Sequence, residues 1–154
     1  MGGAVVVMRR VETGESYSGE ISLDLFQGGA FKAKAYLVQV LKVVTEGMER
    51  LRVSQDEPIH ICTGYILSKT REALIEEGYT VEAVKIVGPT QELAEREFLK
   101  SLVRLGIGDM TTVASMRSFN SFLAWVHDDL VERERFVKTG WTSWPRLREG
   151  SAPE

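Results

Sequence analysis

The sequence holds very few residues of the kinds that build disulfides and transition-metal centres. Its 154 residues include one cysteine, Cys62, and two histidines, His60 and His127. A single cysteine excludes an internal disulfide and a cysteine-rich zinc site. Two histidines are too few for a zinc cage that relies on imidazole ligands. We therefore expect no structural metal and no resident cofactor.

Long apolar runs and an excess of positive charge are also missing. No apolar stretch approaches the roughly 20 residues that cross a bilayer. The apolar run in MGGAVVVMRR is too short for the core of a signal peptide, and it precedes the arginines. These absences predict a cytoplasmic protein without a membrane partner. The net charge of −3 gives no strongly basic nucleic-acid footprint, which leaves only a local basic patch open.

What is present predicts one α/β domain over residues 1–137 and a tail over 138–154. Apolar residues make up 44% of the chain, enough for a substantial core. The order β-β-α-β-α-β-α-α predicts a mixed sheet, formed by an N-terminal antiparallel hairpin plus parallel strands, with helices on both faces. Apolar periodicity places the strands at 4–11, 17–26, 59–62 and 79–87, and the helices at 30–52, 68–77, 90–105 and 118–137.

Two of these strands end in a glycine that is followed at once by a helix. Ligands of open α/β sheets bind beyond the carboxyl ends of the strands. Glycine permits a close approach of the backbone, and the N–H groups of a helix's first turn favour an anion. The sequence thus predicts an anion- or phosphate-binding edge. Its candidate residues are Thr63, Gly64, Tyr65, Ser68, Gly88, Thr90 and Gln91.

A simpler interpretation of the same loops also stands. Glycine before a helix is common turn chemistry, and Ser68 or Thr90 fits an ordinary helix start. The chain has neither GxGxxG nor GxxxxGK[ST], so no motif supports dinucleotide or Walker-type phosphate binding.

Three carboxylates form the second candidate site. Asp24 is expected on the polar face of the second strand, and Glu92 and Glu95 in the first turns of a helix. Carboxylates that converge at a sheet edge can hold two Mg²⁺ ions for phosphodiester hydrolysis. Glu92 and Glu95 equally fit an exposed helix start, where they complement the helix dipole.

With these residues in view, the element order of residues 4–105 resembles the ribonuclease H-like fold. The resemblance implies a divalent-metal-dependent nuclease or phosphohydrolase, with Asp24, Glu92 and Glu95 as its catalytic candidates. The chain departs from that family in its first strand, AVVVMRRV, which has no acidic residue, and in having two opening strands where the family has three.

Three further features bear on function. Cys62, two residues after His60 on a strand, is interpreted as a small buried thiol. Segment 138–148 sets Trp141 and Trp144 among basic residues, which fits docking onto the domain or a second subunit and also fits nucleic-acid contact. The broad apolar stripe of helix 30–52 indicates deep burial or a second partner, so we expect a homo-oligomer through this helix or the tail.

Together these patterns predict a binding or assembly module with an anion-binding edge, and a metal-dependent nuclease or phosphohydrolase as the alternative. The sequence leaves open whether the chain is an enzyme.

Overall fold

The computed structural model describes residues 1–150 of the chain. The strands are β1 (Ala4–Arg9), β2 (Ser16–Ile21), β3 (Ile59–Cys62) and β4 (Val81–Val84). The α-helices are α1 (Gly28–Lys32), α2 (Ala35–Arg50), α3 (Ser68–Glu76), α4 (Pro89–Arg104), α5 (Met110–Ser115), α6 (Phe119–Asp128), α7 (Leu130–Arg133) and α8 (Trp144–Arg148). Three single turns of 3-10 helix are η1 (Leu23–Phe26), η2 (Tyr65–Leu67) and η3 (Glu134–Phe136).

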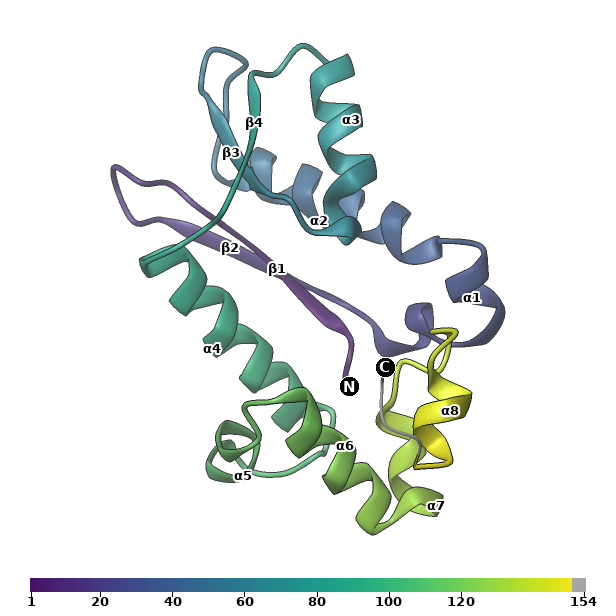
Figure 1. Cartoon of the computed structure of the whole chain (residues 1–154). Coiled ribbons are helices and arrows are strands. Elements are labelled where there is room, and N and C mark those ends of the chain that lie inside the picture. The colour runs from purple at the N-terminus through teal and green to yellow at the C-terminus, as the bar shows by residue number, and fades with distance from the viewer. Residues whose placement is uncertain (151–154) are drawn as a thin grey trace.

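The predicted α/β class and element order are confirmed. β1 and β2 form an antiparallel hairpin, and β3 and β4 pair in parallel. The two pairs are separate two-stranded sheets rather than neighbours in one hydrogen-bonded sheet. α2 packs on the hairpin and on α3, so it lies between the hairpin and the α3 layer, while α4 runs along β1 on the other side of the hairpin (Figure 1).

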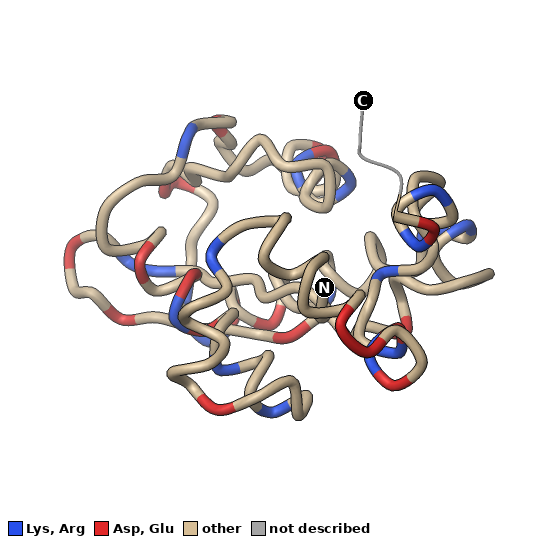
Figure 2. Tube along the Cα trace, turned by 60° about the horizontal axis from the view of Figure 1, so that its bottom comes forward, with Lys and Arg blue, Asp and Glu red and all other residues tan. Residues whose placement is uncertain are grey.

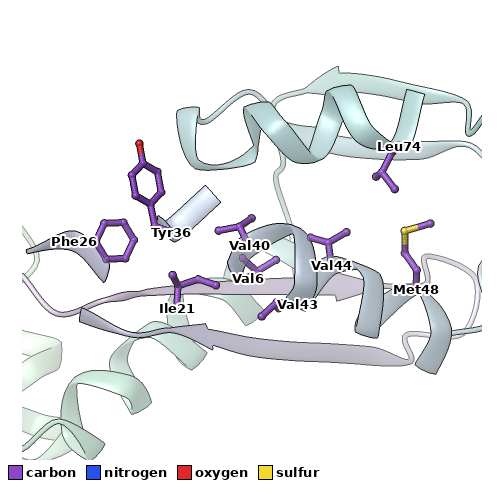
Figure 3. Close-up of a cluster of buried hydrophobic side chains, with 9 residues drawn as sticks. All are labelled: Val6, Ile21, Phe26, Tyr36, Val40, Val43, Val44, Met48 and Leu74. Carbon is purple, nitrogen blue, oxygen red and sulfur yellow. The ribbon is translucent and has the colours of Figure 1, made fainter. Parts of the chain in front are cut away.

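The main core forms where α2 meets the hairpin (Figure 3). Val6 and Ile21 project from the strands, Val40 and Val43 from α2, and Leu74 reaches the same cluster from α3. Burying each of these side chains contributes roughly 1.5–3 kcal/mol. The apolar stripe on α2 is thus covered from two sides within the chain at Val40, Val43, Val44 and Met48, while Val38 stays 56% exposed.

Glycine sets the distance between α2 and the hairpin. A Cβ added to Gly19 of β2 would lie 2.5 Å from a methyl group of Val43. A Cβ added to Gly47 of α2 would lie 2.7 Å from Met8 and Tyr17. Both glycines therefore permit a helix-to-strand approach that any larger residue would push apart.

Several expected boundaries were wrong for local reasons. The second strand ends at Ile21, because Leu23 and Phe26 turn into the core three residues apart and form η1 instead. Helix 30–52 is divided at Lys34, whose φ of 55° lies in the left-handed region. Helix 118–137 is divided at Asp129, whose φ of −153° is extended and whose side chain caps α7.

None of the helices within residues 1–150 combines the length and the apolar character needed to cross a membrane.

Candidate functional site

The Gly64 loop is held by its own chain. Arg71 in α3 donates from Nη1 to the carbonyl oxygen of Cys62 at 2.7 Å and to that of Gly64 at 3.1 Å. The Leu67 amide also donates to the Gly64 carbonyl, at 3.1 Å. These bonds satisfy the carbonyl groups of Cys62 and Gly64. They also fix the start of η2 and with it the position of Tyr65. Thr63 is exposed and Ser68 half-buried beside it.

The Gly88 loop has a different backbone conformation from the Gly64 loop and lies on the other side of the hairpin. Gly88 has a φ of 67°, which requires glycine, and it begins α4. Thr90 and Gln91 follow in the first turn, where Gln91 donates to Glu95 Oε1 at 2.9 Å. The chain after β4 crosses to the far side of the hairpin before α4 starts, whereas α3 starts beside α2 (Figure 1). The structure therefore does not bring the two glycine loops together.

The start of α4 is also acidic, which weakens its fit to an anion. Glu92 stands in the first turn and Glu95 one turn later, and both are exposed. Carboxylates here already complement the positive end of the helix dipole. Of the two predicted loops, only the one at Gly64 remains electrostatically suited to a negative ligand.

The three candidate carboxylates do not form a metal site. Asp24 was expected on the second strand but lies in η1, where it is exposed. Glu92 and Glu95 lie on α4, across the hairpin from α2. Within residues 1–150, no group of three or more Asp, Glu, His or Cys side chains is placed to hold a metal ion.

The interpretation of Cys62 as a buried thiol was wrong. β3 and β4 bury one face, with Ile61 in the core, and leave the other face uncovered. Cys62 is exposed on that open face together with His60. His60 Nε2 lies 3.6 Å from Glu82 Oε2, its neighbour on β4, and both side chains are largely exposed. A two-stranded parallel sheet covered on one side exposes residues that a larger sheet would bury.

The Gly64 loop meets an aromatic cluster that the sequence did not predict. The aromatic cluster consists of Phe26, Phe31, Tyr36, Tyr65 and Trp141, from four helical elements and the loop before α8. Tyr65 makes edge contacts with Tyr36, at a centroid separation of 6.0 Å, and with Trp141, at 5.3 Å. Phe26 and Tyr36 are buried, while Tyr65 is 46% exposed and Trp141 38% exposed. The cluster is therefore anchored in the core and open at Tyr65 and Trp141.

The segment after η3 is docked onto this cluster. Gln27 donates from Nε2 to the carbonyl oxygen of Val137 at 2.8 Å, and the Gly140 amide donates to that of Phe26 at 3.0 Å. Phe31 lies against Trp141, with centroids 5.3 Å apart. In Figure 1 the yellow chain before α8 reaches up to α1. The C-terminal segment thus contributes Trp141 to a surface that also contains the Gly64 loop.

Lys138 brings a cation to the same place. Its Nζ lies 4.5 Å from the centroid of the Phe26 ring, a cation–π contact. Burial lowers the pKa of Lys138 from its usual value of 10.5. Burial also raises the pKa of Tyr65, with a smaller contribution from Tyr36, so the Tyr65 hydroxyl stays protonated at neutral pH.

Charge is segregated along the segments that build the cluster. Residues 25–45, 58–71 and 135–148 contain nine Lys and Arg and no Asp or Glu. The rest of the chain holds ten Lys and Arg against all 22 Asp and Glu. Both signs are spread over the whole trace (Figure 2), so the segregation is local to these three segments.

Four of the five lysines in these segments, all but Lys42, lie within a few residues of a cluster member in the sequence, and none of the four has an acidic partner within residues 1–150. Lys32 and Lys34 are exposed in the link between Phe31 and Tyr36, Lys69 is exposed one helical turn after Tyr65, and Lys138 lies on Phe26. Within residues 1–150, no carboxylate lies within ion-pair distance of any of the four. We call these four lysines together with the aromatic cluster the basic aromatic face.

Comparison with protein-family models, with curated proteins and with solved structures finds no match to this chain. The resemblance to the ribonuclease H-like fold therefore stays a prediction.

Proposed function

We propose that this chain is a binding module for an anionic ligand, which it holds on the basic aromatic face. The observation that carries the proposal is the charge segregation. Three segments that meet at one aromatic cluster carry nine basic residues and no acidic one, in a chain whose net charge is −3. Among the nine, Arg148 is paired with Glu134, whereas Lys32, Lys34, Lys69 and Lys138 have no counter-ion within residues 1–150. Cations without counter-ions create a local positive potential, which attracts anions even when the net charge is negative.

The proposal retains half of the edge expected from the sequence. Thr63, Gly64, Tyr65 and Ser68 stay in the candidate site, because Tyr65 belongs to the aromatic cluster. Gly88, Thr90 and Gln91 leave it, because they start an acidic helix on the other side of the hairpin. The nuclease alternative has no observation in its favour, since Asp24, Glu92 and Glu95 form no metal-holding group.

Two charge-matched variants test the proposal. The first replaces Lys32, Lys34 and Lys69 by Gln, and the control replaces Lys85, Arg96 and Lys100, which lie after β4 and on α4. Binding of fluorescently labelled inorganic polyphosphate is measured by anisotropy at low salt. Because charge-assisted hydrogen bonds contribute more than neutral ones, and exposed pairs are screened, we expect the first variant to lose about tenfold in affinity.

The control should stay within about twofold of the unmodified chain, because its charges lie away from the face. Equal losses in the two variants would show that polyphosphate responds to net charge alone. No binding by the unmodified chain at low salt would remove the proposal.

A further inference from the structure

We infer that the anion held on the basic aromatic face is the backbone of a single-stranded nucleic acid, whose bases stack on Tyr65 and Trp141. This inference rests on the proposed function and adds to it the class of ligand.

The exposed rings carry the argument. A phosphate alone would be held by the lysines and would need no aromatic surface. Tyr65 and Trp141 are nevertheless large apolar side chains that stay 46% and 38% exposed. Their rings lie against each other at 84° and 5.3 Å, supported from below by Phe31 and Tyr36. Rigid exposed rings next to unpaired cations form the usual platform for single strands, because every base has a stacking face.

The placement of the cations fits a strand that crosses the ring pair. Lys32 directly follows Phe31, which touches Trp141, and Lys69 follows Tyr65 by one helical turn. Cations therefore belong to the segments on both sides of the ring pair, and Lys138 lies against Phe26 of the same cluster. A backbone with one negative charge per nucleotide can meet these cations in turn while its bases reach the rings.

A duplex or an acidic polypeptide fits less well. The bases of a duplex are paired and stacked on one another, so they are not free to stack on side chains. A poly-Glu chain would meet the lysines but has no aromatic ring to stack on Tyr65 and Trp141. The face thus favours a single strand over both.

The test compares five probes on the full chain by anisotropy. Two are single-stranded, oligo-dT and oligo-U of about 12 nucleotides, within the range of known site sizes. The others are a duplex of that length, and polyphosphate and a poly-Glu peptide of matched charge. The variant Trp141→Leu removes a stacking ring and retains an apolar side chain. The control Phe119→Leu removes an aromatic ring that is 56% exposed on α6, outside the face.

We expect Trp141→Leu to weaken oligonucleotide binding by about tenfold, the effect of losing one stacked base. Its affinity for polyphosphate should stay within about twofold, and Phe119→Leu should change neither. Tyr65→Leu provides a second variant, which decides the matter if Trp141→Leu does not fold. The Lys32, Lys34 and Lys69 triple variant should reduce the slope of log affinity against log salt by about 2, at about 0.7 per lost phosphate contact. A difference between oligo-dT and oligo-U identifies which strand is preferred.

The outcomes separate the inference from the proposed function. If polyphosphate and oligonucleotide bind alike and neither ring variant discriminates between them, the anion site stands and the inference falls. Tighter binding of the duplex, or of a poly-Glu peptide with the same charge, would also overturn it. If no probe binds at low salt, the proposed function fails together with the inference.

Discussion

The basic aromatic face and the opposite end of α2 treat charge in opposite ways. At the far end of α2, Arg10 of the hairpin segment donates from Nη1 to Glu57 Oε2 at 2.5 Å and from Nη2 to Glu57 Oε1 at 3.1 Å. Its remaining donors reach the carbonyl oxygens of Leu51 at 2.8 Å and Arg52 at 2.9 Å. We call Arg10, Leu51, Arg52 and Glu57 the arginine corner.

The charges of the arginine corner stabilise the fold, whereas those of the basic aromatic face remain available to a ligand. In the arginine corner one guanidinium ties the end of β1, the end of α2 and the loop before β3 together, and the chain supplies its own counter-ion. A surface hollow of about 550 Å³ adjoins the corner, but Glu12, Glu15 and Glu57 line it beside the arginines. On the basic aromatic face the lysines have no such partner within residues 1–150. A paired charge fixes structure, while an unpaired one leaves its potential for a ligand.

Gly140→Ala is expected to have the largest effect, because it disrupts the basic aromatic face while it leaves the arginine corner unchanged. A Cβ added at Gly140 would lie 2.4 Å from Phe31 Cβ and 2.8 Å from the Phe26 carbonyl oxygen. Gly140→Ala should therefore lower the free energy of unfolding by about 1–3 kcal/mol through overpacking, as measured by urea denaturation. It should also weaken polyphosphate binding, because Trp141 and Lys138 shift with residue 140.

Gly29→Ala is the matched control for this substitution. Gly29 lies in α1 near the same cluster, yet an added Cβ would meet no atom within 4 Å. Replacing a helical glycine by alanine should be neutral or stabilising by up to about 1 kcal/mol. If Gly140→Ala behaves like Gly29→Ala, the segment after η3 is not docked in the way described.

The sequence predicted the strands and helices around the basic aromatic face better than it predicted the contacts within that face. The bounds of β3 are confirmed at Ile59–Cys62, and the expected helix starts near Ser68 and Thr90 lie within a residue of the observed ones. These elements follow from local periodicity and turn residues. The contact of Tyr65 with Trp141 joins residues 76 positions apart, which no local pattern encodes. The signal that was available is the absence of acidic residues from the three segments that contain the residues of the aromatic cluster.

Two wrong expectations have the same kind of cause. Cys62 was assigned to the core because a free cysteine is among the residues most often buried. The split into two small sheets leaves one face open, and that is a tertiary outcome. No glycine or proline marks the break between α1 and α2 in the sequence. The residue in the left-handed conformation there is Lys34, and a non-glycine residue rarely adopts it.

The arginine corner should lose its stabilising effect at acid pH. The hydrogen bonds from Arg10 are the largest cause that lowers the pKa of Glu57 from 4.5 to about 2, followed by the Ser54 amide. Because this pKa is lower in the folded than in the unfolded chain, the stabilising effect is complete above about pH 4.5 and is lost as the pH falls toward 2. Glu57→Gln should lower the urea midpoint at pH 7 and flatten its dependence on pH in this window.

Asp56→Asn is the control, because it removes the same charge one residue away, where no arginine is paired with it in the described chain. It should leave the urea midpoint at pH 7 close to that of the unmodified protein, because it removes no hydrogen bond from Arg10. Neither variant should alter polyphosphate binding, since the corner lies at the other end of α2. A loss of binding in Glu57→Gln would mean that the two regions are not independent.

The smallest expected effect on stability comes from Lys138→Met. The substitution removes a cation–π contact of about 0.5–1 kcal/mol and also removes a half-buried ammonium that has no carboxylate partner, so the net change at pH 7 should be below about 1 kcal/mol. Above pH 7, the direction in which stability changes with pH is specific to Lys138. Between the lowered folded pKa of Lys138 and 10.5, the unfolded chain binds a proton that the folded chain has released, so stability rises with pH.

Above pH 7, the urea midpoint of the unmodified protein should therefore rise with pH relative to the midpoint of Lys138→Met. Lys138→Arg serves as the control, because its charge persists through this range. At neutral pH, polyphosphate should stabilise the unmodified protein and Lys138→Arg more than Lys138→Met, because only these two carry a cation in contact with Phe26. Equal stabilisation of all three would place the anion away from Lys138 and confine the face to its exposed lysines.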